Sequence, residues 1–260
     1  MTSTPLKAKV APRSRGRALA AAGISRSFQG VRALHDVTVR VDSTQIMGLI
    51  GPNGAGKSTL VNILSGYDRP DTGAVELDGV DITKKSGFRR SRLGIARTFQ
   101  HGHIFRALSV RENVEVTALA SGRTARQSRQ DSLHWLELME LLDWSDRGAS
   151  NLPHGVERRL GVARALATWP GHVLLDEPAA GLNEGEVEAF ALSIRKVNKE
   201  YGIGVLLIDH NMPLIMGLCD RVHVLVHGES LLEGPPDEVR KDKTLAVAYL
   251  GSTATREGVG

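Results

Sequence analysis

Alternating apolar and polar positions near the start of the chain predict a small antiparallel sheet. Strands are expected over residues 19–28 and 37–41, separated by the turn-forming pair Gln29-Gly30, and a third strand over 74–77 ends at Asp78-Gly79. In the second segment, apolar side chains recur at every other position, which is typical of a strand with one buried face. Glycine after Gln or Asp favours the tight turns that join antiparallel strands.

The rest of the chain alternates between short apolar runs and longer segments with helical periodicity. The expected strands cover 45–50, 172–175, 204–208 and 221–226. The expected helices cover 57–64, 158–168, 184–201 and 212–218. Strands that alternate with helices in this way predict a parallel α/β sheet.

A helical segment interrupts this alternation between about Ser109 and Leu142. Its leucines recur at near-helical spacing around a basic stretch at 123–129, which predicts a helical subdomain inserted at about 101–157. We expect Trp135 and Trp144 to pack in its core or at an interface rather than to stack on nucleic-acid bases.

Length and composition indicate one large domain with an insertion. The chain has 260 residues, 41% of them hydrophobic and 24% charged, which is ordinary for a globular protein. Cys219 is the single cysteine, so no intrachain disulfide can form. No apolar run reaches the roughly 18 residues of a transmembrane helix, and the N-terminus lacks the apolar region of a signal peptide.

The net charge of +4 is concentrated at the N-terminus. Residues 1–17 contain five basic residues and no acidic residue, and the remainder carries 28 basic against 29 acidic residues. We expect this segment to be a disordered tail, with contact to anionic lipid or nucleic acid as the open alternative. The near-neutral body argues against a nucleic-acid-binding protein.

A glycine-rich loop between the strand at 45–50 and the helix at 57–64 predicts a phosphate-binding site. The loop consists of Gly51, Pro52, Asn53, Gly54, Ala55, Gly56, Lys57 and Ser58, which matches G-x-x-x-x-G-K-[ST]. Its backbone N–H groups and the helix N-terminus attract an anion, while Lys57 reaches the β- and γ-phosphates. The Ser58 hydroxyl can ligate Mg²⁺, and Thr59 can hold the α-phosphate.

Two adjacent carboxylates end the apolar strand at 172–175. Because ligand sites form at the carboxyl ends of parallel strands, Asp176 is placed to orient Mg²⁺ through a water molecule. Glu177 can point at the attacking water as general base. An acidic pair after a strand is usually a helix cap or a solvated turn, but the upstream phosphate loop favours the catalytic interpretation.

Together with four further features, these residues resemble the ATP-binding subunits of ABC transporters over about residues 18–250. The resemblance implies that Gln100 approaches Mg²⁺ and the attacking water and senses a permease, and that His210 contacts the γ-phosphate. It also implies that Phe28 stacks on adenine and that the loop ending at Asn183 belongs to the nucleotide site. The fold it implies is a P-loop NTPase: a RecA-like parallel-sheet core, a small antiparallel β-subdomain and an inserted helical subdomain, followed by a C-terminal tail at 251–260.

The chain departs from the family pattern at the signature segment, where Leu-Ser-Gly-Gly-Gln would stand. Pro153 replaces the serine, His154 the first glycine and Val156 the glutamine, while Gly155 is retained. Gly155 and the helix N-terminus can still hold an anion through backbone N–H groups, and His154 can supply a side-chain donor. The Asp of the family's D-loop is Asn183 here, so activation across a dimer is expected to be weak or one composite site degenerate.

Within that family, the signature segment, the run at 176–183 and the ending Ala248-Tyr249-Leu250-Gly251 resemble branched-chain amino acid importer ATPases. This resemblance implies an ATPase with ATP and Mg²⁺ at the cytoplasmic face of the cell membrane. It implies membrane permease subunits, a second identical or related ATPase subunit, and indirectly a periplasmic or lipid-anchored binding protein. His101 and His103 are expected to face the permease rather than to bind zinc.

Two other functions stay open at this point. One is a soluble ABC ATPase that acts on DNA, ribosomes or iron–sulfur assembly, although the chain lacks a second cassette and a long coiled-coil insert. The other is a catalytically weak regulatory partner in an asymmetric dimer, which Pro153 and Asn183 favour and the intact Lys57, Glu177 and His210 disfavour.

Overall fold

The computed structural model describes residues 17–99 and 104–244. Predictions for Gln100, His101 and His103, for the tail up to residue 16, and for residues 245–260 lie outside the described residues.

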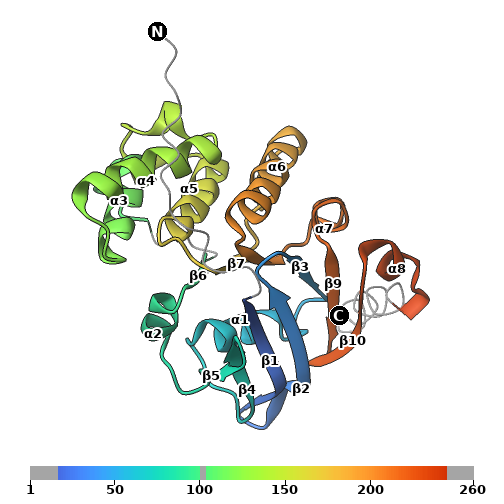
Figure 1. The fold of residues 1–260 in the computed structure, drawn as a ribbon. Helices are drawn as coiled ribbons and strands as arrows, with labels where there is room; N and C mark the ends of the chain where they lie inside the picture. The colour runs from blue at the N-terminus through green and yellow to red at the C-terminus, as the bar shows by residue number, and fades with distance from the viewer. Residues whose placement is uncertain (1–16, 100–103, 245–260) are drawn as a thin grey trace.

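Two sheets form the body of the protein (Figure 1). The first is antiparallel, in the order β2-β1-β4-β5, and comprises β1 (Ala18–Phe28), β2 (Val31–Asp42), β4 (Thr72–Leu77) and β5 (Val80–Asp81). The second has the order β10-β9-β3-β8-β7-β6 and comprises β3 (Ile46–Ile50), β6 (Ile95–Arg97), β7 (His172–Asp176), β8 (Gly204–Ile208), β9 (Arg221–Val226) and β10 (Glu229–Gly234). The predicted antiparallel and parallel sheets are both confirmed, except that β10 pairs antiparallel with β9 at one edge.

The described residues also form a set of α-helices. They are α1 (Lys57–Ser65), α2 (Gly87–Arg92), α3 (Val110–Ala120), α4 (Ala125–Leu138), α5 (His154–Leu166), α6 (Glu184–Tyr201), α7 (Met212–Leu218) and α8 (Pro236–Lys241), with short 3-10 turns at Leu142–Trp144 and Ala149–Asn151. Figure 1 shows α3, α4 and α5 grouped together, away from the antiparallel sheet. Trp135 is fully buried in this part, so the expectation that it packs in the core is confirmed.

The parallel sheet separates two hydrophobic cores. Ile46 and Ile50 of β3 face the core that contains α5, α6 and α7, whereas Met47 and Leu49 face the core that contains α1 and the antiparallel sheet. Strand side chains alternate between faces, so a strand buried on both sides is apolar throughout. Because α1 shares its core with the antiparallel sheet, the loop before α1 lies where both sheets meet.

Two turn predictions are confirmed by backbone angles. Gln29 and Gly30 have φ values of 48° and 85°, and Asp78 and Gly79 have values of 57° and 76°. Both pairs lie in the left-handed region that tight antiparallel hairpins require.

Two helix predictions were wrong in their bounds. The single helical segment from 109 to 142 is divided into α3 and α4, because Ser109 and Thr124 each cap a separate helix N-terminus. The helix expected from 158 begins at His154 instead and ends at Leu166. Gly155 lies in the first turn of this helix and allows close packing, because a Cβ there would lie 2.7 Å from Leu182 Cδ2.

Candidate nucleotide site

The phosphate loop lies close to the backbone of two strands, which explains why glycine occupies positions 51 and 56. Gly51 has φ 153°, and a Cβ there would lie 2.0 Å from the Leu225 carbonyl oxygen of β9. Gly56 has φ 100°, and its Cβ would lie 2.5 Å from the Ala33 carbonyl oxygen of β2. Only glycine combines these angles with such close approach. The sequence at 51–56 therefore fixes a tight backbone cradle at the start of α1.

Lys57 points into this cradle. Its Nζ donates hydrogen bonds to the carbonyl oxygens of Gly51 at 2.7 Å and Pro52 at 3.0 Å, and the residue is 8% exposed. Burial lowers the pKa of Lys57, while the nearby carboxylates of Glu177 and Asp176 raise it. The hydrogen bonds of this buried ammonium group go to neutral carbonyl oxygens, so the group is well suited to pair with the charged oxygens of a phosphate.

The first turn of α1 offers further donors. Gly56 caps the helix without a side-chain hydrogen bond, so no side chain occupies the first N–H groups of α1. Ser58 is exposed and Thr59 half-buried in the same turn. Their hydroxyl groups are thus placed as the sequence predicted, at the positively polarised end of the helix.

Asp176 is buried at the end of β7 and paired with an arginine. Its Oδ2 lies 3.3 Å from Arg97 Nη2, and the two side chains are 5% and 9% exposed respectively. Burial raises the pKa of Asp176, and the charge of Arg97 opposes that rise. The Asp176 N–H also donates to the Thr98 hydroxyl at 3.1 Å. Arg97 at the end of β6 thereby holds the Asp176 carboxylate, and Thr98, which follows it, holds the Asp176 backbone.

Arg97 and Thr98 were not singled out by the sequence analysis. They lie just before Phe99 and Gln100. The signal that could have found them is their position at the end of β6, which pairs with β7: Arg97 is its last residue and Thr98 follows it. The Arg97 guanidinium also donates to Asn62 Oδ1 on α1 and lies 5.0 Å from the Phe99 ring centroid. It therefore connects the carboxylate at 176 to the helix that carries the phosphate loop.

Glu177 and His210 lie at the ends of two adjacent strands, β7 and β8. His210 Nε2 is 3.1 Å from Glu177 Oε1, so the structure brings together two residues that are 33 positions apart. Glu177 has φ 49°, a strained angle for a non-glycine residue, and its N–H donates to the Ile208 carbonyl oxygen. A strained backbone angle persists where the neighbouring structure imposes it, and here the hydrogen bond to Ile208 of β8 holds the Glu177 backbone.

A buried aspartate fixes the segment that carries His210. Asp209 Oδ2 accepts from the Ala179 N–H at 3.1 Å, and Oδ1 accepts from the Asn211 N–H at 2.9 Å. The strand ends of β7 and β8 are therefore tied together directly beside the Glu177–His210 pair.

The donor set fits Mg²⁺. Ser58 supplies a hydroxyl oxygen and Asp176 a carboxylate oxygen, the hard ligands that Mg²⁺ takes together with water and phosphate oxygens. Among the described residues, no group of three or more His, Cys, Asp and Glu side chains could hold a metal ion without such additional ligands.

The altered signature segment forms the N-terminus of α5. Pro153 is the cap residue, His154 is exposed, and Val156 is buried with 4% exposure. Valine at 156 therefore packs in the core instead of presenting a polar group. Asn183 caps α6, since its Oδ1 accepts from the Glu186 N–H at 3.0 Å. Gly155 lies against Leu182, and the His154 Cβ lies close to Gly181, so the signature segment and the loop before α6 are neighbours.

Phe28 ends β1 and is 44% exposed. The Arg26 guanidinium carbon lies 4.5 Å from the centroid of its ring. Arg26 therefore contacts the ring while part of the ring stays exposed, and an aromatic residue needs such an exposed surface to stack on a base.

Known proteins are similar to this chain in both sequence and structure. The family described as "ABC transporter" matches residues 34–180. The high-affinity branched-chain amino acid transport ATP-binding protein LivG of Salmonella typhimurium is 38% identical over 248 residues, covering 90% of this chain and 97% of LivG. BraF of Pseudomonas aeruginosa, which carries the same description, is 36% identical with the same coverage. A crystal structure of an ABC transporter's ATP-binding cassette in its ADP conformation matches with a TM-score of 0.81 and 28% identity, covering 90% of this chain and 99% of that cassette.

Proposed function

The chain belongs to the ABC transporter family, and from that premise we propose that it drives the import of branched-chain or related amino acids. It is an ATP-binding cassette whose fold and family are those of transport ATPases. The substrate class is supported by LivG and BraF, whose similarity extends over 90% of the chain. In the described residues no helix is long and apolar enough to cross a membrane. The proposal therefore includes membrane permease subunits that form the pore.

The observation that carries the catalytic proposal is the Glu177–His210 pair beside the phosphate loop. In the proposed mechanism, the loop N–H groups and Lys57 bind the β- and γ-phosphates. Glu177 accepts the proton of the attacking water, and His210 holds the Glu177 carboxylate in place and contacts the γ-phosphate. Mg²⁺ held by Ser58, and by Asp176 through a water molecule, would neutralise charge on the phosphates.

The remaining anion donors come from a second ATPase subunit. In a head-to-tail dimer, the N-terminus of α5 would face the γ-phosphate bound by the partner's loop. His154 and Gly155 stand at that N-terminus, and the exposed imidazole of His154 replaces the missing serine hydroxyl as donor. Asn183 is proposed to line the same junction, although its own side chain is engaged in capping α6. Gln100 is proposed to complete the site near Mg²⁺.

The permease is proposed to dock in a groove between the helical subdomain and the core. A cavity of about 200 Å³ lies there; its lining includes Ser91, Arg97, Phe99, Thr117, Arg164 and Thr168. Arg97 thus borders both the groove and Asp176, which offers a route by which docking affects the catalytic centre. Docking to a membrane permease would place the chain at the cytoplasmic face of the membrane.

The test is reconstitution of the chain with its permease subunits and binding protein in lipid vesicles. We expect ATP-dependent uptake of radiolabelled leucine, isoleucine or valine, and loss of uptake with Glu177→Gln. Hydrolysis without uptake of any of the three, while another amino acid or a different class of solute is imported, would contradict the substrate proposal. Hydrolysis by a chain that associates with no permease would favour the soluble alternative, and hydrolysis confined to a partner subunit would favour the regulatory one.

A further inference from the structure

Arg26 is built into the protein as a support for the Phe28 ring. The two residues are two positions apart on β1, so their side chains project from the same face of the strand. The guanidinium carbon lies 4.5 Å from the ring centroid, within the range of a cation–π contact. Phe28 remains 44% exposed, so the guanidinium covers only part of the ring.

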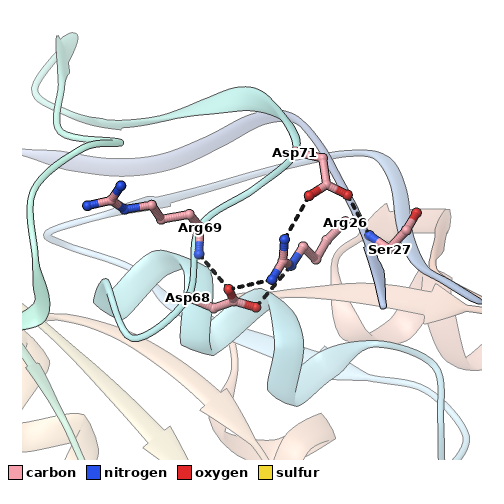
Figure 2. A network of polar contacts seen from close by, with 5 residues as sticks. All are labelled: Arg26, Ser27, Asp68, Arg69 and Asp71. Carbon is pink, nitrogen blue, oxygen red and sulfur yellow. Dashed lines mark hydrogen bonds and ion pairs between the residues drawn. The ribbon is translucent and has the colours of Figure 1, made fainter. Parts of the chain in front are cut away.

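Two aspartates fix the orientation of the guanidinium (Figure 2). Arg26 Nη2 and Nε donate to Asp68 Oδ1 and Oδ2 at 3.0 and 3.2 Å, and Arg26 Nη1 donates to Asp71 Oδ1 at 2.7 Å. Asp71 Oδ2 in turn accepts from the Ser27 N–H at 2.7 Å. All three guanidinium nitrogens are therefore engaged, which an arginine fork allows and a lysine ammonium does not.

Asp68 also connects Arg26 to the helix that follows the phosphate loop. The Asp68 N–H donates to the Asn62 carbonyl oxygen on α1, the helix that starts at the loop. On the other side, Phe28 pairs with Val31 of β2, the strand that also carries Ala33, whose carbonyl oxygen limits the space at Gly56. The ring is thus held at a set distance from the phosphate site by two separate connections.

We propose that Arg26 is a positioning residue for the base of a bound nucleotide: it holds the Phe28 ring from one face so that the other face receives the purine. This proposal rests on the proposed function, ATP binding by this cassette, and on the family resemblance, which implies that Phe28 stacks on adenine. A ring that is already fixed loses less conformational freedom when the base binds, so the support contributes to affinity for the base but not for the phosphates. Asp68 and Asp71 compensate the guanidinium charge.

The test compares ATP with tripolyphosphate, which has the phosphates but no base, by isothermal titration calorimetry. Arg26→Met is expected to weaken ATP binding about threefold to fivefold and to leave tripolyphosphate binding unchanged. Arg40→Met is the matched control, because Arg40 is also an arginine of the antiparallel sheet paired with an aspartate, Asp42, and both are well exposed. It should alter neither affinity.

Further variants separate positioning from folding. In a Phe28→Ala background, Arg26→Met should have no additional effect on ATP binding, because there is no ring left to hold. Asp71→Asn keeps the arginine and removes one anchor, so it should weaken ATP binding less than Arg26→Met does. Equal weakening of ATP and tripolyphosphate by Arg26→Met, or unchanged ATP binding, would overturn the proposal. A parent protein that binds neither ligand would instead overturn the proposed function on which it rests.

Discussion

Replacing Arg97 by methionine is expected to destabilise the nucleotide-free protein strongly. The variant keeps a side chain of similar length but leaves the Asp176 carboxylate without its cationic partner, and Asp176 is only 5% exposed. Asn62 Oδ1 loses a donor at the same time. A buried carboxylate that loses its ion-pair partner must become protonated or remain charged, and here only the weaker influence of Lys57 and Arg158 would then compensate the charge.

The magnitude follows from the burial of the pair. Breaking a buried ion pair from one side costs about 3–5 kcal/mol. For a domain of this size, 1 kcal/mol lowers the melting temperature by roughly 2–4 °C, so we expect a decrease of about 6–20 °C. Arg40→Met, which breaks the exposed pair with Asp42, should cost no more than about 1 kcal/mol.

The cost of Arg97→Met should depend on pH in a defined direction. Burial raises the pKa of Asp176 above its ordinary value, and Arg97 opposes that rise. A carboxyl group whose folded pKa exceeds its unfolded pKa lowers the free energy of unfolding as pH increases between the two values. Without Arg97 the pKa of Asp176 in the folded protein rises further, so the pH range over which the free energy of unfolding falls extends upward. The loss of unfolding free energy in the variant, relative to the parent, is therefore smallest near pH 4 and larger at pH 8.

Thermal unfolding in EDTA, followed by calorimetry from pH 4 to pH 8, measures this difference. Asp176→Asn in the Arg97→Met background should recover part of the lost stability, because an amide does not carry the uncompensated charge. A loss below about 1 kcal/mol, or a loss independent of pH, would refute the argument that a buried charge pair holds Asp176.

Three further predictions concern the phosphate loop and the signature segment. Lys57→Ala should weaken ATP binding by at least about 100-fold in a titration, because two charge-assisted hydrogen bonds to phosphate are lost; unchanged affinity would contradict the loop assignment. Gly54→Ala should lower the free energy of unfolding by about 1–2 kcal/mol, because φ is 82° there although no atom lies within 4 Å of the new Cβ. Gly51→Ala should lower it clearly more, because its Cβ would lie 2.0 Å from a carbonyl oxygen. Equal losses in thermal unfolding would refute the close-packing argument. His154→Ala should slow ATP hydrolysis by the assembled transporter about tenfold, the worth of one hydrogen bond, whereas a parent rate throughout pH 6–8 would leave only the backbone donors.

Sequence periodicity predicted the elements that are long or strongly apolar. The bounds of α6, β8, α7 and β9 agree with the predictions. For α6, β8 and β9 the reason is that a clear period or an apolar run ends at a polar or glycine residue, namely Gly202, Asp209 and His227. Short elements were missed: β5 has two residues and β6 three, too few to show a period. Their strands form because neighbouring strands offer unpaired hydrogen-bonding groups, which is a property of the fold and not of the local sequence.

The candidate site was predictable where a motif fixes the chemistry and less so where tertiary contacts do. Lys57, Asp176 and Glu177 follow from the spacing of loop and strand. The supports of the site, Arg97 behind Asp176 and Arg26 behind Phe28, depend on strand pairing and on a helix end that are far away in the sequence. The burial of Val156 likewise became evident only once α5 was seen to begin at His154.

The most direct test of the catalytic assignment is the response of Glu177→Gln to ATP and Mg²⁺, measured by light scattering and phosphate release. We predict that the variant binds ATP and accumulates as an ATP-stabilised dimer while hydrolysis falls by about 10²- to 10⁴-fold, because the amide cannot accept the proton of the attacking water. Glu229→Gln, at an exposed position on β10, should behave as the parent protein does. Hydrolysis by Glu177→Gln at the parent rate would contradict the account.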